Sequence, residues 1–303
     1  MALKKPEWLK IKLQGNQNSN TVEHTLGDFS LNTVCQEANC PNKMECYARR
    51  TATFMIMGKN CTRNCKFCNV TTKRPEALDP EEPKNVAIAV KKLGLKHAVI
   101  TSVDRDDLKD DYGAYHFAAV TMEIKKLNPH TTVELLIPDM HGDKRLLDII
   151  FAEKPDIINH NVEVVEEYFD YICPQCDLDM SLEVLRYAKE KGFITKSGMM
   201  VGFGETEDMV IDMMRRLREV DCDMLTIGQY LQPSRKHIEV KEYVTPEQFD
   251  RYRDIGLEMG FRSVSSGPFV RSSYHAEMLE DTSEGLSAEK QKLQDKLNET
   301  AHA

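Results

Sequence analysis

Six short apolar segments alternate with six amphipathic segments between residues 51 and 262, and this alternation is the strongest constraint on the fold. The apolar segments are rich in β-forming residues, whereas the amphipathic ones repeat apolar residues at helical spacing. We expect strands at 53–57, 97–102, 133–138, 156–160, 194–202 and 224–230. We expect helices at 83–94, 114–128, 144–154, 181–192, 206–220 and 245–260. Such alternation requires parallel pairing with right-handed crossovers, so the sequence predicts a doubly wound sheet or a barrel.

Both architectures bind ligands in the loops that follow the carboxyl ends of the strands. The first predicted strand, TFMIM, runs directly into Gly58 and then into a loop with three cysteines. A ligand site is therefore expected at this loop. Residues 1–50 are mostly polar, with an evident loop at GNQNSN, and we expect an irregular extension wrapped on the core.

Composition limits the possible partners. With 303 residues and 41% hydrophobic content, the chain is long enough to bury one substantial core. Its net charge of −9 gives no general attraction to nucleic acid or to anionic membranes, so neither is predicted as a partner. The N-terminus lacks the features of a signal or transit peptide, and no stretch approaches the ~18–20 apolar residues of a membrane span. We therefore expect a cytoplasmic protein, in which clustered cysteines indicate metal or redox chemistry.

Two cysteine triplets precede the second predicted strand. One has the spacing C-x4-C-x5-C and the other C-x3-C-x2-C, and their members are Cys35, Cys40, Cys46, Cys61, Cys65 and Cys68. Structural zinc sites use four ligands, often in C-x2-C pairs, and neither triplet offers that pattern. Buried apolar cysteines would not be expected beside Arg63, Asn64 and Lys66. An iron–sulfur cluster is favoured for the second triplet, with zinc and apolar burial as alternatives.

A [4Fe–4S] cluster held by three cysteines leaves one iron free to bind a cofactor. The C-x3-C-x2-C loop after the first strand of a βα barrel resembles that of the radical S-adenosylmethionine (SAM) enzymes. The resemblance implies a partial (βα)6 barrel with an N-terminal cluster-binding extension and a C-terminal extension. It also implies that SAM chelates the open iron and is cleaved by one electron to methionine and a 5′-deoxyadenosyl radical. Phe67, between the last two cysteines, is implied to lie near adenine.

The first triplet narrows the resemblance to the lipoyl synthases, over roughly residues 5–277. Matching blocks occur in the order KPEWLKIKL, TATFMIMG, TSVDRDDL, NHNVE, TKSGMMVGFGET, LTIGQYLQPSRKH and SSGPFVRSSYHAE. The resemblance implies a second, auxiliary [4Fe–4S] cluster on the first triplet. Its fourth ligand would be Ser273, the second serine of the R-S-S-Y block at 271–274. An alkoxide is a harder and weaker ligand for iron than a thiolate, which suits a cluster that is dismantled.

The family chemistry implied for this chain takes sulfur from the auxiliary cluster and inserts it at C6 and C8 of a protein-bound octanoyl-lysine. Each insertion uses one SAM-derived radical, and we expect both clusters near one barrel mouth. The implied partners are octanoylated lipoyl-carrier domains, on the acyltransferase subunits of 2-oxoacid dehydrogenases and on the glycine cleavage H protein. A ferredoxin- or flavodoxin-type protein is the implied electron donor.

Further polar residues at the predicted strand ends are candidates for binding SAM. Gly202 and Glu205, in VGFGE, resemble cofactor contacts of the family, although glycine-rich strand ends also serve simply as turns. Asn161 and Glu163, in NHNVE, resemble SAM-contacting positions. His160 taken alone is more typical of a core histidine.

Two further segments each allow more than one interpretation. Cys173 and Cys176 form a C-x2-C pair where lipoyl synthases usually have Arg-Pro, which allows a third metal or redox site, but we favour two incidental thiols. Arg235 and Lys236 could meet an acidic carrier domain, although most such runs are solvated loops. The polar segment after Asp281 is assigned no chemistry.

The expected organisation is an N-terminal extension at 1–50, a barrel at 51–262 and a C-terminal segment at 263–303. Other functions stay open on the sequence alone. One is a different radical SAM sulfur-inserting enzyme, of the biotin synthase or methylthiotransferase type. Another is a non-catalytic module that binds zinc or iron–sulfur clusters.

Overall fold

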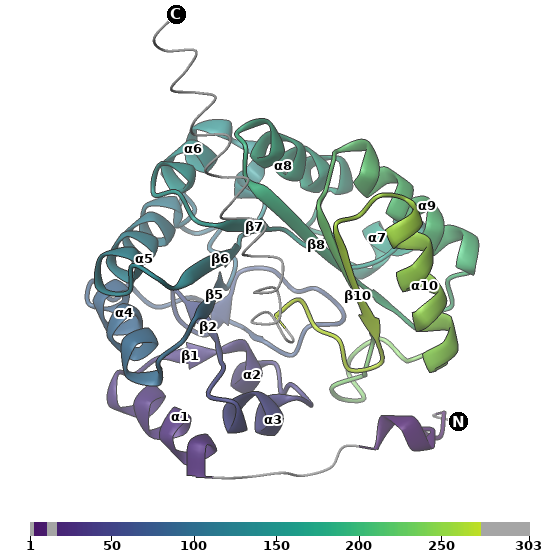
Figure 1. The fold of residues 1–303 in the computed structure, drawn as a ribbon, viewed down its shortest axis with the longest axis horizontal. Coiled ribbons are helices and arrows are strands. Elements are labelled where there is room, and N and C mark those ends of the chain that lie inside the picture. Colours follow the sequence, from purple (N-terminus) through teal and green to yellow (C-terminus); the bar gives the residue numbers. More distant parts are fainter. Residues whose placement is uncertain (1–2, 11–16, 274–303) are drawn as a thin grey trace, which may run out of the picture.

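A curved sheet, ringed by helices, forms the body of the protein (Figure 1). A computed structural model of the chain describes residues 3–10 and 17–273. The strand order of the main sheet is β1-β2-β5-β6-β7-β8-β9-β10. Its strands are β1 (Asn32–Thr33), β2 (Thr53–Ile56), β5 (His97–Ser102), β6 (Thr132–Leu136), β7 (Ile157–Asn159), β8 (Ile194–Val201), β9 (Met224–Gln229) and β10 (Ser263–Gly267). From β2 to β10 every neighbouring pair is parallel, whereas β1 is antiparallel to β2.

The sheet is an open barrel, because within the described residues β1 and β10 are its two edges and do not pair with each other. Helices follow the strands and cover the outside of the sheet (Figure 1). They are α4 (Glu82–Leu93), α5 (Ala114–Leu127), α6 (Lys144–Ala152), α7 (Glu166–Ile172), α8 (Leu178–Glu190), α9 (Glu207–Glu219) and α10 (Pro246–Glu258). The six predicted strands and six predicted helices are confirmed. The partial (βα)6 barrel is therefore correct, and α7 is an additional helix that the sequence did not indicate.

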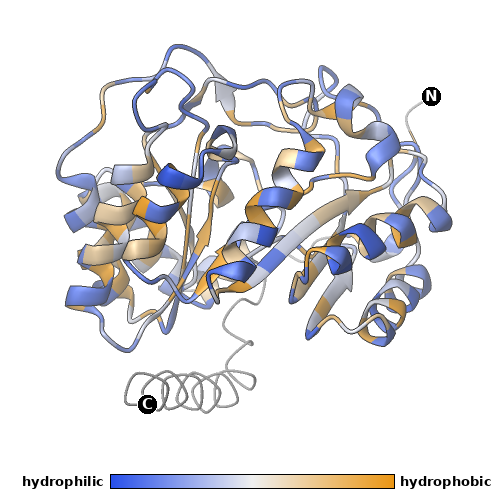
Figure 2. Ribbon diagram, turned by 90° about the horizontal axis from the view of Figure 1, so that it is seen from above, coloured by the Kyte–Doolittle hydropathy of each residue, from blue (hydrophilic) through white to orange (hydrophobic). Residues whose placement is uncertain are grey.

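The apolar periodicity that predicted these elements is explained by their burial. Phe54 and Leu135 belong to one core cluster, between the first strands and helices α4 and α5. Leu225 and Phe249 belong to a second cluster, between the last strands and helices α9 and α10. Apolar residues predominate on the strands and on the helix turns that face them, whereas hydrophilic residues predominate on the outer helix turns (Figure 2). Strands covered on both faces read as nearly continuous apolar runs, which makes them easy to recognise in a sequence.

The N-terminal region is helical where we expected irregular structure. It contains the 3-10 helix η1 (Glu7–Leu9) and the helices α1 (Gln17–Asp28), α2 (Val34–Glu37) and α3 (Lys43–Ala48). The expected loop at 15–20 is wrong from residue 17 onward, since α1 begins there. Most of α1 is polar, and Val22 and Leu26 are its buried apolar side chains. Two apolar contacts made with the rest of the fold gave too little helical periodicity to be seen in the sequence.

The C-terminal segment completes the sheet and then enters the barrel. β10 is parallel to β9, and β1 pairs with β2, so the expected boundaries at 50/51 and 262/263 do not coincide with the edges of the sheet. After β10 the chain turns toward the middle of the ring in Figure 1. A Cβ added to Gly228 would lie 2.2 Å from the carbonyl oxygen of Val270, which shows how closely this segment crosses β9. Tyr274 and the polar segment after Asp281 lie outside the described residues.

Within the described ranges, no helix combines the length and apolar character that a membrane crossing needs.

Candidate active site

The second cysteine triplet lies on the loop that follows β2. Met57 and Gly58 have positive φ angles of 67° and 90°, and they turn the chain out of the sheet. Cys61 belongs to the short strand β3 (Asn60–Cys61), which pairs with β4 (Thr71–Thr72). The Cys61 thiol donates to a carboxylate oxygen of Asp104, with 3.7 Å between the sulfur and oxygen atoms. This contact joins the loop to the carboxyl end of β5, where the ligand site was expected.

The three thiols of this loop are costly to ionise without a metal. Burial, and to a lesser extent the negative charges of Asp104 and Cys68, raise the pKa of Cys61 to about 12. Burial raises the pKa of Cys68 to about 11, and burial and Glu163 raise that of Cys65 as well. A bound cationic centre would reverse this balance, because metal coordination deprotonates thiols. Three such sulfurs on one loop suit an iron–sulfur cluster.

A buried arginine holds the cysteine loop in place. Arg63 is 6% exposed and forms paired hydrogen bonds with Asp139, at 2.5 and 2.9 Å, and with Asp106, at 3.1 Å each. Burial opposes ionisation of Asp106, but hydrogen bonds, with that from Arg63 the largest, outweigh it and lower its pKa to about 2. None of these three residues was predicted from the sequence to have a role in the site. The acidic residues directly after the predicted strand at 97–102 were the available signal.

A cavity of about 150 Å³ lies beside this loop and is lined by Cys65, Phe67, Asn161 and Glu163, among other residues. The structure thus brings together three of the predicted SAM contacts and one predicted iron ligand. The hydroxyl of Ser102 and Nε2 of His160, both at residues lining the cavity, are buried without a hydrogen-bond partner. Buried polar atoms normally have partners, so these two atoms fit a site for a polar ligand such as SAM.

Glu163 is held in an unusual backbone conformation within this cavity. Its φ angle is +63°, and its amide donates to the carbonyl oxygen of Gly198 at 3.0 Å. Burial raises the pKa of its carboxyl to about 7. His160 also lines this cavity, and Nδ1 of its ring lies 2.8 Å from the carbonyl oxygen of Ile137. Burial lowers the pKa of the His160 imidazole. Burial thus disfavours the charged form of both side chains, the imidazolium of His160 and the carboxylate of Glu163.

The VGFGE turn is arranged differently from the other predicted contacts. Glu205 accepts hydrogen bonds from the amides of Gly202, at 2.5 Å, and Phe203, at 2.9 Å. Gly202 has a φ angle of +112°, and an added Cβ would lie 2.1 Å from Nε2 of Gln229. Neither Gly202 nor Glu205 lines the 150 Å³ cavity. The contact of these two residues with SAM stays a prediction.

The first triplet lies at the opposite end of β2. Burial, and to a lesser extent the nearby Cys35 and Cys40, raise the pKa of Cys46 to about 12, so the three cysteines are neighbours. Burial and Cys40 raise the pKa of Cys35 to about 11, partly offset by hydrogen bonds from Thr53. Thr53 is the first residue of β2, whereas the second triplet follows its last residue. The expectation that both clusters lie at one barrel mouth is therefore wrong.

The two serines of the R-S-S-Y block point to different sites. The Thr53 hydroxyl donates to the Ser273 hydroxyl at 2.6 Å, beside the first triplet. Ser272 donates to the side-chain oxygen of Asn161 at 3.0 Å, and Asn161 lines the cavity beside the second triplet. The side-chain Nδ2 of Asn42, a residue between Cys40 and Cys46, donates to the carbonyl oxygen of Phe269 at 2.6 Å and ties the same segment to the first triplet.

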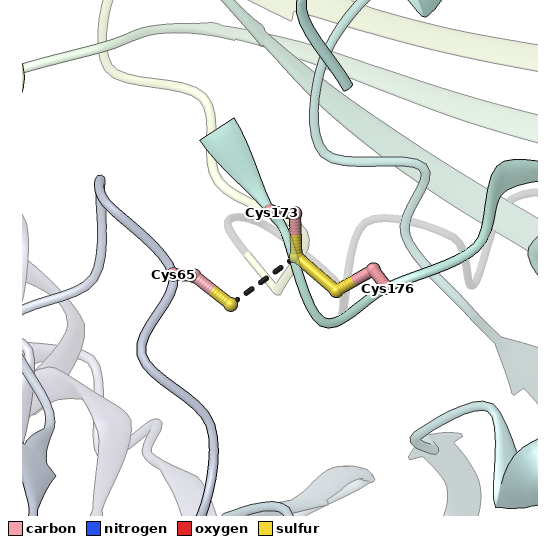
Figure 3. A group of neighbouring side chains, drawn as sticks. All are labelled: Cys65, Cys173 and Cys176. Atoms are coloured by element: carbon pink, nitrogen blue, oxygen red, sulfur yellow. Dashed lines mark hydrogen bonds between the residues drawn. A yellow bond between two sulfur atoms is a disulfide. The ribbon is translucent and has the colours of Figure 1, made fainter. Parts of the chain in front are cut away.

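Cys173 and Cys176 are not incidental thiols, and that expectation is wrong. They form a disulfide, and the Cys65 thiol donates to the Cys173 sulfur with 3.2 Å between the two atoms (Figure 3). The ligand atoms of all three cysteines lie within 4.8 Å of one another. The pair comes from the segment after α7, 108 residues along the chain from Cys65, so no local pattern could predict this contact.

The open parallel barrel and its three-cysteine loop are those of a radical SAM enzyme, and residues 55–217 match the model of the Radical SAM superfamily. The lipoyl synthase of Caldanaerobacter subterraneus is 56% identical, over 92% of this chain and 98% of its own length. The lipoyl synthase of Flavobacterium psychrophilum is 53% identical, over 90% and 94%. The mitochondrial lipoyl synthase of Nematostella vectensis is 50% identical over the same shares. This chain belongs to the lipoyl synthase family.

Solved structures of other enzymes share the fold. A crystal structure of methylornithine synthase has a TM-score of 0.55 at 16% identity, and the match covers 70% of each chain. Streptococcus suis SuiB bound to S-adenosylmethionine has a TM-score of 0.54 at 11% identity, over 72% of this chain and 51% of that one. At these identities the likeness shows a common barrel and carries no information on the substrate.

Proposed function

We propose that this enzyme inserts sulfur at C6 and C8 of an octanoyl group attached to a lysine of a lipoyl-carrier domain. When bound, the cluster on Cys61, Cys65 and Cys68 would supply the electron that cleaves SAM, and the auxiliary cluster would supply the sulfur. The first triplet and Ser273 would hold that auxiliary [4Fe–4S] cluster. The chain's own part is to hold the two centres, to position SAM and the alkyl chain, and to exclude water.

The observation that carries this proposal is the placement of the two triplets at opposite ends of β2. Four residues of an extended strand span roughly 13 Å, which sets the order of the separation between the two sites. An alkyl chain that enters the barrel can then meet a radical formed at one end and a sulfur donor at the other. An unactivated methylene group offers no proton to a general base, so such chemistry needs no acid–base pair.

Ser273 is favoured over Ser272 as the fourth ligand of the auxiliary cluster. Ser273 is hydrogen-bonded to Thr53, and Thr53 also interacts with the thiol of Cys35. Ser272 is engaged with Asn161 on the other side of the segment. A hard alkoxide ligand is a poor match for iron and can be exchanged more readily than a thiolate. This lability suits a cluster that gives up its sulfur.

Phe67, Asn161 and Glu163 would form the SAM site together with the unpaired polar atoms of Ser102 and His160. The carboxylate of Glu163 offers a partner for the positive sulfonium or for hydroxyl groups, and Phe67 offers an apolar face for a planar base. Gly202 and Glu205, on the turn after β8, are proposed as further contacts with SAM.

A large groove next to the cysteine loop is the proposed docking site of the carrier domain. It has a volume of about 1150 Å³, and its lining includes Cys68, Lys66, Lys236 and Lys241. These three lysines outnumber the one acidic residue of the lining, Glu239. The net positive charge of the groove favours an acidic partner, because opposite surface charges steer association. Arg235, the other predicted contact, does not line it. The proposed substrates are octanoylated acyltransferase subunits of 2-oxoacid dehydrogenases and the glycine cleavage H protein, with a ferredoxin or flavodoxin as electron donor in the cytoplasm.

The proposal is tested with anaerobically reconstituted protein, SAM, a strong reductant and an octanoyl-lysine peptide. We expect 5′-deoxyadenosine and a peptide that is heavier by two sulfur atoms. Formation of 5′-deoxyadenosine without a thiolated peptide would exclude the proposal that this substrate receives sulfur, and it would favour another radical SAM reaction. Colourless protein that holds metal without labile sulfide would identify a zinc-binding module instead.

A Cys40→Ala variant tests the auxiliary cluster separately. We expect this variant to cleave SAM and to leave the peptide unmodified. Continued sulfur insertion by Cys40→Ala would exclude the first triplet as the source of sulfur.

A further inference from the structure

The Cys173–Cys176 disulfide lies beside Cys65 in the lining of the cavity proposed for SAM, and the proposed reaction gives this disulfide no role. Cys173 is buried, whereas Cys176 is partly exposed. The C-x2-C spacing places both sulfurs on one short turn, and a pair so spaced readily alternates between dithiol and disulfide. The Cys173 sulfur is the one that contacts Cys65, at 3.2 Å (Figure 3). Cys176 is partly exposed, so this residue can be reached by reagents from solution.

The turn that carries this pair is fastened to the cysteine loop. The amide of Lys66 donates to the carbonyl oxygen of Ile172 at 2.9 Å, and the amide of Asn64 donates to the side-chain oxygen of Gln175 at 2.6 Å. The ammonium of Lys66 lies 3.3 Å from the centre of the Tyr171 ring. These contacts come from the residues on either side of Cys65. They hold the Cys65 and Cys173 sulfurs together without relying on a bond between them.

We propose that Cys173 and Cys176 form a dithiol–disulfide pair that returns oxidised Cys65 to its thiol form. The proposal goes beyond sulfur insertion and uses from it only the assignment of Cys65 as an iron ligand. Cysteines that have lost a cluster are open to oxidation, and an oxidised Cys65 cannot bind iron again. The structure has the arrangement expected at the end of such a repair, with Cys65 as a free thiol and the neighbouring pair as a disulfide.

The exchange is balanced without an outside electron source. Starting from Cys65 in a mixed disulfide with a small thiol, the thiolate of Cys173 attacks the Cys65 sulfur and expels that small thiol, which takes up a proton. The thiolate of Cys176 then attacks the Cys173 sulfur, which forms the Cys173–Cys176 bond and releases Cys65. Two sulfur–sulfur bonds form and two break, and the two protons lost by the pair appear on Cys65 and the small thiol. A dithiol reductant then restores the pair for another cycle.

The position of Cys65 explains why it would be the target among the three iron ligands. Cys65 is the ligand whose sulfur is grouped with Cys173 and Cys176 in the described residues. Cys61 is instead directed to Asp104. A single oxidised ligand is enough to prevent cluster assembly, so protection of one thiol preserves the whole site.

The test starts from the full-length, cluster-loaded protein with the dithiol pair reduced. Air and glutathione disulfide remove the clusters and oxidise thiols, after which free thiols are alkylated and all cysteine linkages are mapped by mass spectrometry. In the unsubstituted protein we expect a Cys173–Cys176 disulfide and Cys65 alkylated as a free thiol. In Cys173→Ser we expect loss of that protection, with glutathione on Cys65 as the main form. In Cys176→Ser we expect the trapped intermediate, a disulfide between Cys65 and Cys173.

Cys222→Ala is the matched control, because Cys222 is a buried free cysteine outside this group, and it should behave as the unsubstituted protein. Equal glutathione on Cys65 in the unsubstituted protein and in Cys173→Ser would overturn the proposal. So would the absence of a Cys65–Cys173 linkage in Cys176→Ser, whose substitution at a partly exposed position keeps the test valid even if Cys173→Ser fails to fold. Because linkages are mapped without SAM or octanoyl substrate, failure here is distinct from failure of sulfur insertion.

Discussion

The hydroxyl of Thr53 donates a hydrogen bond of 2.6 Å to the hydroxyl of Ser273, across 220 residues of sequence. Thr53 opens β2 and also interacts with Cys35, so one side chain links the N-terminal triplet to the C-terminal segment. The neighbouring Ser272 donates a hydrogen bond to Asn161, which lines the cavity proposed to bind SAM. Two adjacent serines are therefore divided between the two sites, and each can be tested by itself.

Replacing Ser273 by alanine should separate SAM cleavage from sulfur insertion. The auxiliary cluster loses its proposed fourth ligand, whereas the cavity at Cys65 and Asn161 is untouched. We expect 5′-deoxyadenosine to form and the thiolated peptide to disappear, measured in the same reaction by mass spectrometry. Ser272→Ala is the matched control, and it should weaken SAM binding by several-fold while keeping the auxiliary cluster, since a typical hydrogen bond contributes about 1 kcal/mol. The reverse pattern would assign the ligand role to Ser272.

Replacing Gly228 by alanine should displace the C-terminal segment from the barrel. The added Cβ would lie 2.2 Å from the backbone oxygen of Val270, which is too close for any real contact. Since Val270 precedes the two serines, we expect loss of auxiliary-cluster iron and of thiolation. Iron and sulfide content per chain measures this loss. Gly27→Ala is the control, because no atom lies within 4 Å of its added Cβ, and its iron content should be unchanged.

Replacing Arg63 by glutamine should destabilise the protein strongly. Asp139 would remain buried with its charge unpaired, and breaking such a buried pair costs roughly 3–5 kcal/mol. The free energy of unfolding from denaturant titration measures the change. Arg145→Gln serves as control, since Arg145 pairs with Asp143 on the surface, and it should leave stability unchanged. Equal effects of the two substitutions would contradict a structural role for the Arg63 network.

The affinity for SAM should rise with pH around neutrality. Burial raises the pKa of Glu163 to about 7, so in the ligand-free protein the carboxyl is protonated below that pH and ionised above it. SAM carries a positive sulfonium, which favours the ionised form. We expect Kd to fall by up to about tenfold per pH unit below the pKa of Glu163, and to level off above it. Calorimetric titration of the cluster-loaded protein measures this dependence. Glu163→Gln should bind SAM weakly at every pH, and an unchanged slope in this variant would exclude Glu163 as its cause.

The sequence was sufficient for the barrel because its strands are buried on both faces. The strands that contain Phe54, Ile100 and Leu225 have no solvent-exposed face, so their sequences read as apolar runs. The polar helix α1 was missed, since its few apolar contacts come from tertiary packing. The edge strand β10, with the sequence SVSSG, was assigned to the C-terminal extension because one apolar residue in five gives no recognisable pattern.

The proposed ligand sets are recognisable in the sequence only where their members are close together along the chain. The cysteines of each triplet are separated by a few residues, so their spacing indicates a common centre. Contacts between distant residues carry no such signal, as with Arg63 and Asp139, 76 residues apart, or Cys65 and Cys173, 108 apart. The opposite placement of the two triplets was also hidden, because it depends on where β2 begins and not on the spacing of the cysteines.

The passage of residues 268–273 through the barrel sets an order of events during biosynthesis. Cys61, Cys65 and Cys68 lie on one loop, so all three are present as soon as that loop has been made. Ser273, in contrast, leaves the ribosome only after every strand of the sheet has been translated. The N-terminal cysteines are thus the first of the proposed ligands to emerge, and Ser273 is the last. With Ser273 as its proposed fourth ligand, the auxiliary cluster would be fully coordinated only in a finished barrel.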